Sequence, residues 1–408
     1  IQFSIIYNVF KNLVIMYVKM EISKTLLAKQ IKNDRLSKNL EVYDGGLGEN
    51  PVPQPKCMIE TLKKYAHLKH YTSSTGIEDL QNILGKNLIV GNGLKPLLFL
   101  IQLAFSKVFK NGVILYFTPY WLSYKEQTNI LNIKTIDIPN TDYKVTPALL
   151  ESVLKHVTVP HMVLFNNPNN PSGLVYTNEE VEKLCVIFKK YNSIVLSDEI
   201  YKYVGHNWTQ VHSPHVYYDN VIIGNSLSKN FASGGYRFGW LKFPDELKML
   251  NKLYDMCKIL ASSIYSCPSI VFQHVAVNAL SIPSDVVKSI KFQKMMYNSV
   301  ADYCKGKFKI MNLKYTDSSA AWYFLLDFNY YKSRLANINI HSSDQLNKYL
   351  AETLGFITVT GSVFGIKKEL VLRYSYVDIK NIDVENNNCD YSNIIKGLEV
   401  LHDWLLSI

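Results

Sequence analysis

Lys229 and Arg237 lie eight residues apart in the stretch SLSKNFASGGYRFGW (226–240). A lysine amine becomes a nucleophile once its surroundings remove the proton, and an arginine offers a rigid, permanently charged fork that matches phosphate or carboxylate. Arginine is rare here, because of 44 basic residues only four are arginines: Arg35, Arg237, Arg334 and Arg373. An arginine at this position therefore needs a reason, in a chain that uses lysine almost everywhere else. Arg35 and Arg334 are interpreted as solvated surface residues.

Four apolar runs rich in valine and isoleucine predict buried strands. They span residues 113–119, 161–168, 193–201 and 220–229. Between the second and third runs, residues 177–192 open with the capping pattern Thr177-x-x-Glu180 and predict a helix. Strands that alternate with helices favour an α/β fold in which a mostly parallel sheet is flanked by helices. The segment 285–408 mixes helices and strands differently and predicts a smaller α+β domain.

Conspicuous polar residues follow three of these predicted strands. The sequence NNPNNPSG (166–173) follows one strand, Asp198 ends the next, and residues 226–229 end a third. In open parallel sheets, ligands bind beyond the carboxyl ends of the strands. The sequence therefore predicts one shared site at this edge of the sheet.

Eight landmarks, in the same order, resemble the fold-type I pyridoxal-phosphate enzymes, specifically the aspartate aminotransferase-like class I and II aminotransferases. They are LGENP (47–51), YTSSTGIEDL (71–80), GNGLK (91–95), PYWLSY (119–124), NNPNNPSG, SDEIY (197–201), SLSKNFASGGYRFGW and LRYSY (372–376). The resemblance covers residues 42–376, which is nearly the whole chain. It implies a fold-type I transferase, with pyridoxal 5'-phosphate as cofactor.

The resemblance also implies roles for residues around the cofactor ring. Lys229 matches the lysine that holds the cofactor aldehyde as a Schiff base and then moves protons at the substrate α-carbon. Asp198 matches the carboxylate that faces the ring nitrogen. Tyr201 and Asn170 match the residues that hydrogen-bond the phenolic oxygen, and Trp121 matches the aromatic residue that stacks on the ring.

A second set of positions matches the family's phosphate-binding residues. They are Ser226, Ser228, Arg237, the amides of Gly93, Leu94 and Lys95, and Tyr71 from a neighbouring subunit. Residues 93–95 lie at the start of a predicted helix, where free amides favour an anion. Leu94 departs from the small residue that is usual there. A tyrosine that crosses between subunits implies a homodimer with shared active sites.

Arg373 matches the arginine that binds the α-carboxylate of the substrate, and Gly48 and Asn170 are assigned to the same end of the site. The implied reaction is a ping-pong transfer of an amino group between an α-amino acid and a 2-oxo acid. A lyase or synthase of the same fold would keep every residue named, and a non-catalytic pyridoxal-phosphate-binding regulatory protein is a further alternative. No second basic residue is assigned to a distal carboxylate, so the substrate stays open.

The composition bears on whether the protein binds nucleic acid, a metal or a membrane. The net charge is +10, but the lysines are spread along the chain, which favours a solvated surface over a nucleic-acid site. The six cysteines form no C-x-x-C pair and no metal-ligand spacing, so we expect a cytoplasmic protein with neither disulfides nor a metal. No membrane partner is expected.

The proposed division of the chain has four parts. Residues 1–19 are interpreted as a non-native or leader extension, because the sequence opens with Ile1 and MEISKTLLAKQ from Met20 looks like an ordinary start. Lys11 interrupts the apolar stretch, which argues against a membrane span, and the stretch lacks the arginine of a transit peptide and a secretory cleavage site. Residues 20–70 are expected to pack with the small domain. The large cofactor-binding domain is placed at 71–284 and the small C-terminal domain at 285–408.

Overall fold

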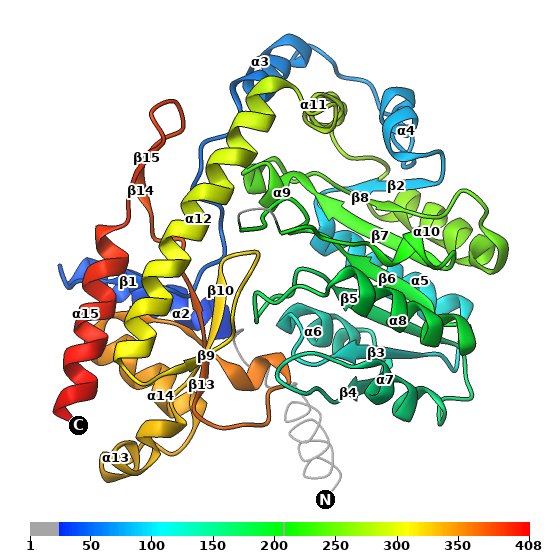
Figure 1. Ribbon diagram of the computed structural model, residues 1–408. Coiled ribbons are helices and arrows are strands. Elements are labelled where there is room, and N and C mark those ends of the chain that lie inside the picture. Colours follow the sequence, from blue (N-terminus) through cyan, green and yellow to red (C-terminus); the bar gives the residue numbers. More distant parts are fainter. Residues whose placement is uncertain (1–23, 207–208) are drawn as a thin grey trace, which may run out of the picture.

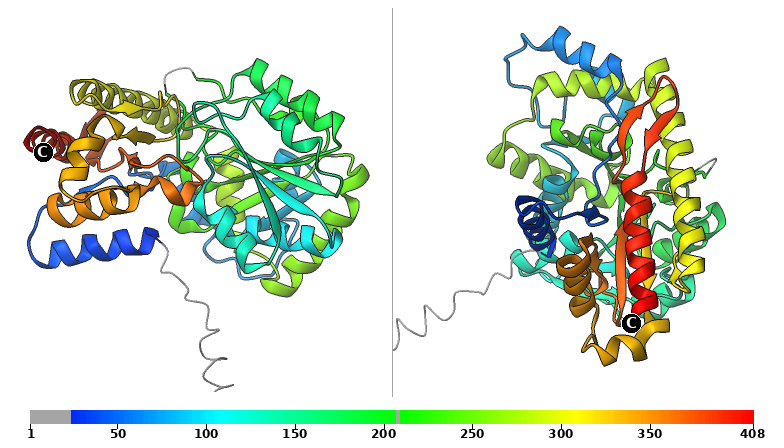
Figure 2. Two further views of the ribbon diagram at one scale, coloured as in Figure 1. Left: turned by 90° about the horizontal axis from the view of Figure 1, so that it is seen from below. Right: turned by 90° about the vertical axis from the view of Figure 1, so that its left-hand side faces the viewer.

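The computed structural model describes residues 24–206 and 209–408, so the predicted extension at 1–19 lies outside the described residues. Two bodies make up the molecule (Figure 1). The large body is built on a seven-stranded sheet and the small body on a four-stranded sheet. Figure 2 shows these bodies side by side, with α2 (Lys24–Ser37) on the small one. The predicted boundaries at 70/71 and 284/285 stay predictions.

The sheet of the large body has the strand order β2-β8-β7-β6-β5-β3-β4. Its strands are β2 (Leu88–Gly91), β3 (Val113–Phe117), β4 (Lys134–Ile138), β5 (His161–Asn166), β6 (Ile194–Asp198), β7 (Val221–Ser226) and β8 (Gly239–Lys242). Only β8 runs antiparallel to its neighbours within this sheet. The α/β fold with a mostly parallel sheet is therefore confirmed.

Helices cover both faces of this sheet, because successive strand residues point to opposite sides. On one face, Ile114 and Leu164 pack with α5 (Leu94–Val108) and α10 (Asn251–Ile264). On the other, Leu115 and Val163 pack with α7 (Pro147–Leu154) and α8 (Asn178–Lys190). The helix α8 begins with the predicted capping box of Thr177 and Glu180.

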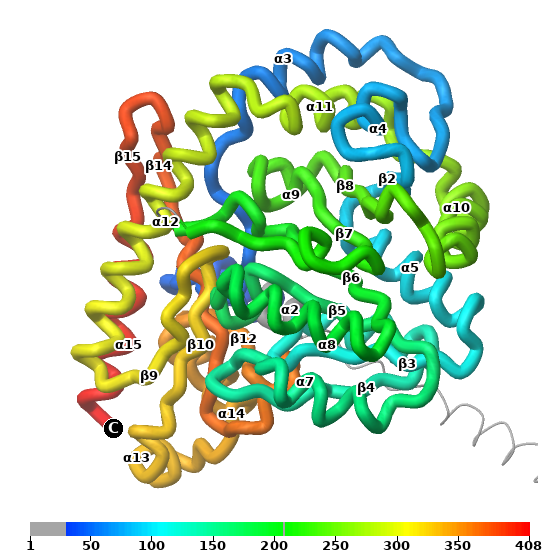
Figure 3. The backbone as a smooth tube through the Cα atoms, turned by 45° about the vertical axis from the view of Figure 1, so that its right-hand side comes forward, coloured from blue at the N-terminus to red at the C-terminus, as the bar shows by residue number. Residues whose placement is uncertain are grey.

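Three helices cover the sheet edge formed by β2 and β8. They are α3 (Lys56–Tyr65), α4 (Glu78–Leu84) and α11 (Ile270–Leu280), which form one apolar cluster with Val90 and Trp240. Figure 3 shows α3 and α11 lying next to each other along the top of the molecule. No single helix in the described ranges is long and apolar enough to cross a membrane; α11 and the following α12 (Ser284–Ile310) pass that test only together, bent by 73°.

The small body contains an antiparallel sheet of order β12-β13-β10-β9. Its strands are β9 (Lys314–Tyr315), β10 (Tyr323–Asp327), β12 (Val359–Thr360) and β13 (Val371–Ser375). The helices are α12, α13 (Lys332–Asn337), α14 (Ser343–Tyr349) and α15 (Ser392–Ser407), and a hairpin joins β14 (Lys380–Asp383) to β15 (Asn388–Asp390). Apolar residues of α12, β10, β13 and α15 share one core.

A connecting segment, residues 45–52, runs between the two bodies. It leaves β1 (Tyr43–Asp44), which pairs in parallel with β11 (Phe356–Ile357) of the small body. It leads to α3 on the large body, and Asn50 Nδ2 donates to the carbonyl of Lys229 at 2.7 Å on the way. The connecting segment therefore passes over the carboxyl ends of the sheet strands.

Candidate active site

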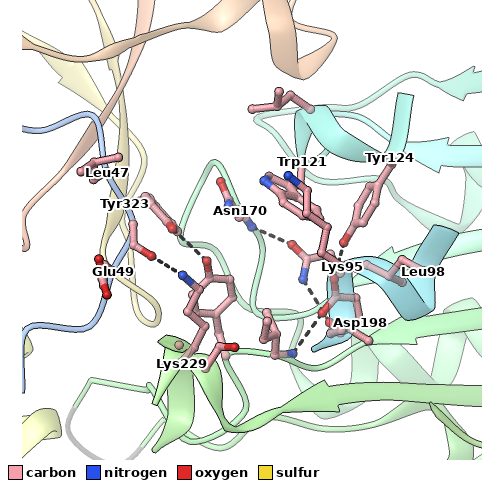
Figure 4. A pocket seen from close by; sticks show the side chains of 18 of the residues that line it. Leu47, Glu49, Lys95, Leu98, Trp121, Tyr124, Asn170, Asp198, Lys229 and Tyr323 are labelled. Atoms are coloured by element: carbon pink, nitrogen blue, oxygen red, sulfur yellow. Dashed lines mark hydrogen bonds between the residues drawn. The ribbon is translucent and has the colours of Figure 1, made fainter. Parts of the chain in front are cut away.

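A cavity of about 390 Å³ lies at the carboxyl ends of β5, β6 and β7, beneath the connecting segment (Figure 4). Eleven of the residues predicted from sequence line it: Gly48, Leu94, Lys95, Trp121, Asn170, Asp198, Tyr201, Ser228, Lys229, Arg237 and Arg373. They come from both bodies and from positions more than 300 residues apart along the chain. The residues that the edge-of-sheet argument selected from the sequence therefore lie around one cavity.

The antiparallel strand β8 explains how Arg237 reaches this edge. An antiparallel strand begins where its parallel neighbours end, and Arg237 lies two residues before β8. The pairing of Gly91 with Gly239 places the loop after β2 beside it. Gly93, with φ of +98°, opens α5, and a Cβ there would lie 2.5 Å from Arg237 Nη2. Gly93 thus keeps space between the arginine and the helix amides.

Two predicted phosphate ligands have other local contacts. Ser226 Oγ accepts from the amide of Ser228 at 3.1 Å and caps the short helix α9 (Leu227–Asn230). Ser226 is fully buried and does not line the cavity, whereas Ser228 does. Leu94 fits despite its size because it packs over Gly224, where a Cβ would lie 2.8 Å from the leucine Cδ1.

Lys229 extends from α9 into the cavity, where Nζ donates to the carbonyl oxygen of Gly48. Burial lowers the pKa of this amine to about 8. The charge of Glu49 opposes that shift, while the positive charges of Arg373 and Arg237 add to it. A neutral amine is therefore accessible near neutral pH, as a nucleophilic lysine requires.

Asp198 ends β6 at the floor of the cavity and is 3% exposed. Tyr124 donates its hydroxyl to Oδ2 at 2.6 Å, and the amide of Ile200 donates to Oδ1 at 3.1 Å. Burial raises the pKa of the carboxyl to about 6, although both hydrogen bonds lower it. A buried carboxylate without an ion-pair partner among the described residues is poised to face a cation.

Arg373 projects from β13 and is 4% exposed. Its Nη1 donates to Asn170 Oδ1 at 3.1 Å and its Nη2 to the carbonyl of Gly46 at 2.7 Å. Among the described residues, Nε has no hydrogen-bond partner. A buried guanidinium with an unsatisfied donor favours an anion such as a carboxylate.

Aromatic residues shape the rest of the cavity. The hydroxyls of Tyr201 and Tyr323 lie 2.8 Å apart, and the ring of Tyr323 lies 4.6 Å from the Arg373 guanidinium. Trp121 precedes α6 (Leu122–Ile130), and the ammonium group of Lys95 lies 5.0 Å from its ring centroid. One face of Trp121 therefore already has a cation over it.

Tyr71 is a predicted site residue that does not line the cavity. It is 88% exposed and lies in the loop between α3 and α4. Within this chain it reaches none of the other site residues, which is the position expected of a side chain that serves a second subunit. The role itself stays a prediction.

Among the cavity-lining residues that sequence reasoning did not assign, Tyr124, Tyr323 and Gly46 contact predicted site residues directly. Tyr124 stands three positions after Trp121, and that helical spacing could have indicated a shared face. Nothing local marks Tyr323, because its contacts depend on strand pairing with residues 50 positions away.

Arg334 is exposed and Arg35 is partly exposed, as expected of surface residues, but both side chains also donate hydrogen bonds to backbone carbonyls. Arg35 donates to the carbonyls of Glu41 at 3.1 Å and Glu352 at 2.6 Å. Arg334 donates to the carbonyl of Leu405 at 3.3 Å. Both side chains hold backbone segments of the small body together, a use of arginine that composition cannot reveal.

A fold of this kind, with a lysine, a buried carboxylate and two arginines on one cavity, defines a fold-type I transferase. The family model for aminotransferase class I and II matches residues 50–384. The chain belongs to the class I and II aminotransferases. It is therefore an aminotransferase, an enzyme that moves an amino group between an α-amino acid and a 2-oxo acid.

Individual relatives agree with this family. An aspartate aminotransferase of Sulfolobus acidocaldarius is 28% identical over 388 residues, covering 88% of this chain and 91% of the relative. A probable aspartate/prephenate aminotransferase of Aquifex aeolicus is 26% identical over 375 residues, covering 86% of this chain and 90% of the relative. The fold resembles that of the Thermus thermophilus aspartate aminotransferase solved with maleate, with a TM-score of 0.80, 21% identity and coverage of 94% and 97%.

The family implies pyridoxal phosphate as cofactor, and the residues of this cavity fit that group. Gly93 leaves a cradle that a Cβ would fill, beside helix amides and Arg237. Asp198 offers a buried acceptor for a ring cation, and Lys229 offers an amine whose pKa burial lowers to about 8. These are the donors and acceptors that a phosphate, a pyridinium and an aldehyde require.

Proposed function

We propose that this chain binds pyridoxal 5'-phosphate in the cavity and uses Lys229 to transfer amino groups by a ping-pong reaction. The observation that carries the proposal is the convergence of Lys229, Asp198 and Arg373 on one cavity. Each comes from a different element, and each has the burial or the pKa shift that its assigned role requires.

The cofactor supplies an aldehyde and an electron-withdrawing ring. Lys229 would hold the cofactor through its amine, and that amine would be the group placed to take up and return the proton of the substrate α-carbon. With a pKa of about 8, half of such amines are neutral at pH 8. In water, where the lysine pKa is about 10.4, fewer than about one in a hundred would be neutral. The buried position therefore gives Lys229 its reactivity.

The remaining residues orient the two reactants. Asp198 would face the ring nitrogen, and its carboxylate would keep a proton there. Arg237, the amides after Gly93 and the hydroxyl of Ser228 would hold the phosphate. Arg373 would take the α-carboxylate of the amino acid, with Asn170 fixing the orientation of the guanidinium.

The test is chemical mapping of the lysine. Borohydride reduction of the holoenzyme, followed by peptide mass analysis, is expected to place the cofactor on Lys229. Lys229→Ala should abolish both the adduct and the half-reaction, while Lys252→Ala, an exposed control on α10, should change neither. A reduced adduct on any other lysine contradicts the assignment.

The ammonium group of Lys95 supports a proposal for the substrate class. Its exposed ammonium lies over Trp121 at the cavity wall, and no carboxylate of the described residues forms an ion pair with it. Similar proteins carry the name aspartate aminotransferase, and one similar fold was solved with maleate, a dicarboxylate. We infer that Lys95 binds a second carboxylate and that the amino donor is a dicarboxylic amino acid such as aspartate.

Comparing the rates for a series of amino donors tests whether the substrate is a dicarboxylic amino acid. The efficiency kcat/KM should be higher for aspartate and glutamate than for alanine and phenylalanine. Lys95→Gln should lower it for the two dicarboxylates by about tenfold or more, the effect of losing a charge-assisted contact, and leave the neutral donors unchanged. An equal loss for all four donors would instead assign Lys95 to the cofactor.

A homodimer is part of the proposal. In the single chain the side chain of Tyr71 is exposed to solvent. Arg237 is exposed as well, although it lines the cavity. A second subunit that brings its own Tyr71 to this opening would complete the phosphate site. A reducing compartment such as the cytoplasm is consistent with the six free cysteines.

A further inference from the structure

Tyr323 stands between the two ends of the cavity, and strand pairing puts it there. In the antiparallel pair of β10 and β13, Leu325 lies opposite Arg373, and Tyr323 lies opposite Ser375. Tyr323 and Leu325 are two residues apart, so both point to the same face of the sheet as Arg373. Tyr323 and Arg373 are therefore diagonal neighbours, within reach of a long side chain.

The ring and the hydroxyl of Tyr323 contact different functional groups. The ring lies 4.6 Å from the Arg373 guanidinium, which also lies 5.2 Å from the Phe364 ring. The hydroxyl lies 2.8 Å from that of Tyr201. Figure 4 shows Tyr323 beside Lys229 and Asn170, facing the connecting segment.

Gly48 shows that the position of Tyr323 is fixed from a third side. A Cβ on Gly48 would collide with the Tyr323 hydroxyl, so only glycine leaves room for it. The carbonyl of the same glycine accepts from Lys229. The connecting segment therefore packs directly on the hydroxyl of Tyr323, which limits its movement away from Tyr201.

We propose that Tyr323 is a positioning residue that holds Arg373 through its ring and Tyr201 through its hydroxyl. The inference rests on the proposed roles of Arg373 and Tyr201. The ring braces one flat face of the guanidinium, so that the fork stays aimed at the substrate carboxylate. Either hydroxyl of the Tyr201–Tyr323 pair can be the donor, and the proposed arrangement has Tyr323 donating. A phenol that accepts a hydrogen bond is a stronger donor in turn, so Tyr201 would then donate more strongly to the cofactor oxygen. Tyr323 thereby supports both the substrate end and the ring-oxygen end of the site.

Two substitutions separate these contributions in the holoenzyme. Tyr323→Phe keeps the ring, so KM for the amino donor and the inhibition constant of maleate should stay within about twofold of wild type. Without the hydroxyl, Tyr201 stabilises the cofactor's phenolic oxygen less, and the pH midpoint of the cofactor absorbance should rise. Tyr323→Leu removes the ring as well, so KM and the maleate constant should rise about tenfold or more while kcat falls less.

The control is Tyr374→Phe. Tyr374 is a buried tyrosine beside Arg373 on β13 and points to the opposite face of the same sheet. Its substitution should leave KM, the maleate constant and the absorbance midpoint unchanged. Thermal melting identifies any variant that does not fold, and Tyr323→Phe tests the hydroxyl even if Tyr323→Leu fails to fold.

The outcomes are distinct. If the midpoint in Tyr323→Phe is unchanged or falls, or if KM rises as much as in Tyr323→Leu, the proposal for Tyr323 is overturned. If the wild-type protein itself shows no cofactor absorbance, the proposed function fails, and the inference fails with it. If the absorbance midpoint rises in Tyr323→Phe while the maleate constant is unchanged, the result supports both the proposed function and the role of Tyr323.

Discussion

The hydroxyl of Tyr124 donates to Oδ2 of Asp198 at 2.6 Å, on a carboxyl group that is 3% exposed. Burial raises the pKa of Asp198, and this hydrogen bond is the largest contribution that lowers it. The charge state of the carboxyl therefore depends on a residue of α6, 74 positions earlier in the chain. The ring of Tyr124 packs edge-on against Trp121 at 5.4 Å.

The first prediction concerns this bond. Tyr124→Phe removes the donor, so the pKa of Asp198 should rise by about one unit. A carboxylate is lost below its pKa, and the acid limb of the kcat/KM profile should therefore move to higher pH. The profile of Tyr254→Phe, a buried control whose hydroxyl bonds the carbonyl of Leu88, should match wild type. A Tyr124→Phe acid limb that stays in place would contradict the assignment.

Changing each of the two cavity arginines, Arg237 and Arg373, to lysine should impair a different step: cofactor binding in one case and substrate binding in the other. Arg237→Lys is expected to weaken retention of pyridoxal phosphate, so excess cofactor should restore much of the activity. Arg373→Lys should retain cofactor but lose about 30- to 1,000-fold in kcat/KM toward every α-amino acid. Assays at limiting and saturating cofactor measure both effects, with Arg334→Lys as the matched control. Rescue of Arg373→Lys by cofactor would mean that the two roles are misassigned.

Hybrid dimers test the role of Tyr71. Lys229→Ala and Tyr71→Phe should each be impaired alone, while mixed subunits form some dimers with one intact site. Random exchange would restore up to about a quarter of wild-type activity, since half of the dimers are hybrids with one good site of two. Tyr330→Phe changes another exposed tyrosine, 66% accessible, and should be fully active by itself. An active monomer in sedimentation experiments refutes the shared site.

A pH dependence of stability is expected from His206. This side chain is 4% exposed, its Nε2 lies 2.7 Å from the Tyr376 hydroxyl, and burial lowers its pKa to about 4. In the unfolded chain a histidine titrates near 6.5. Between these values the unfolded state binds more protons, so the free energy of unfolding falls as pH drops from about 6.5 to about 4.

Urea unfolding measures this effect. From pH 7.5 to pH 5, His206 alone should reduce the free energy of unfolding by about 2 kcal/mol. In His206→Gln, which titrates in neither state, the loss over the same range should be smaller by that amount. His402→Gln, a partly exposed histidine on α15, should keep the wild-type dependence. Identical pH slopes in wild type and His206→Gln would show that His206 is charged or accessible in the folded state.

The sequence was sufficient wherever function depends on local pattern. The apolar runs predicted β3, β5, β6 and β7, and the polar residues at their ends predicted the cavity. It was insufficient where a contact depends on register between distant segments. The stack of Tyr323 on Arg373 requires the pairing of β10 with β13, and the capping contact of Ser226 requires knowing where α9 begins. The hydrogen bonds of Arg35 and Arg334 could not be foreseen for the same reason, since their partners are backbone carbonyls of distant residues.

The carbonyls of Gly46 and Gly48 accept from Arg373 and Lys229, respectively. A main-chain oxygen is the same whatever side chain accompanies it, so these bonds constrain the length of the connecting segment rather than its composition. Inserting or deleting one residue between the two glycines would displace a carbonyl from one of the cations. Leu47 and Glu49 also line the cavity, and neither side chain takes part in these two bonds. Exchanging Leu47 would re-line the site for new substrates while the lysine and the arginine keep their places, whereas removing the charge of Glu49 would also lower the pKa of Lys229 further.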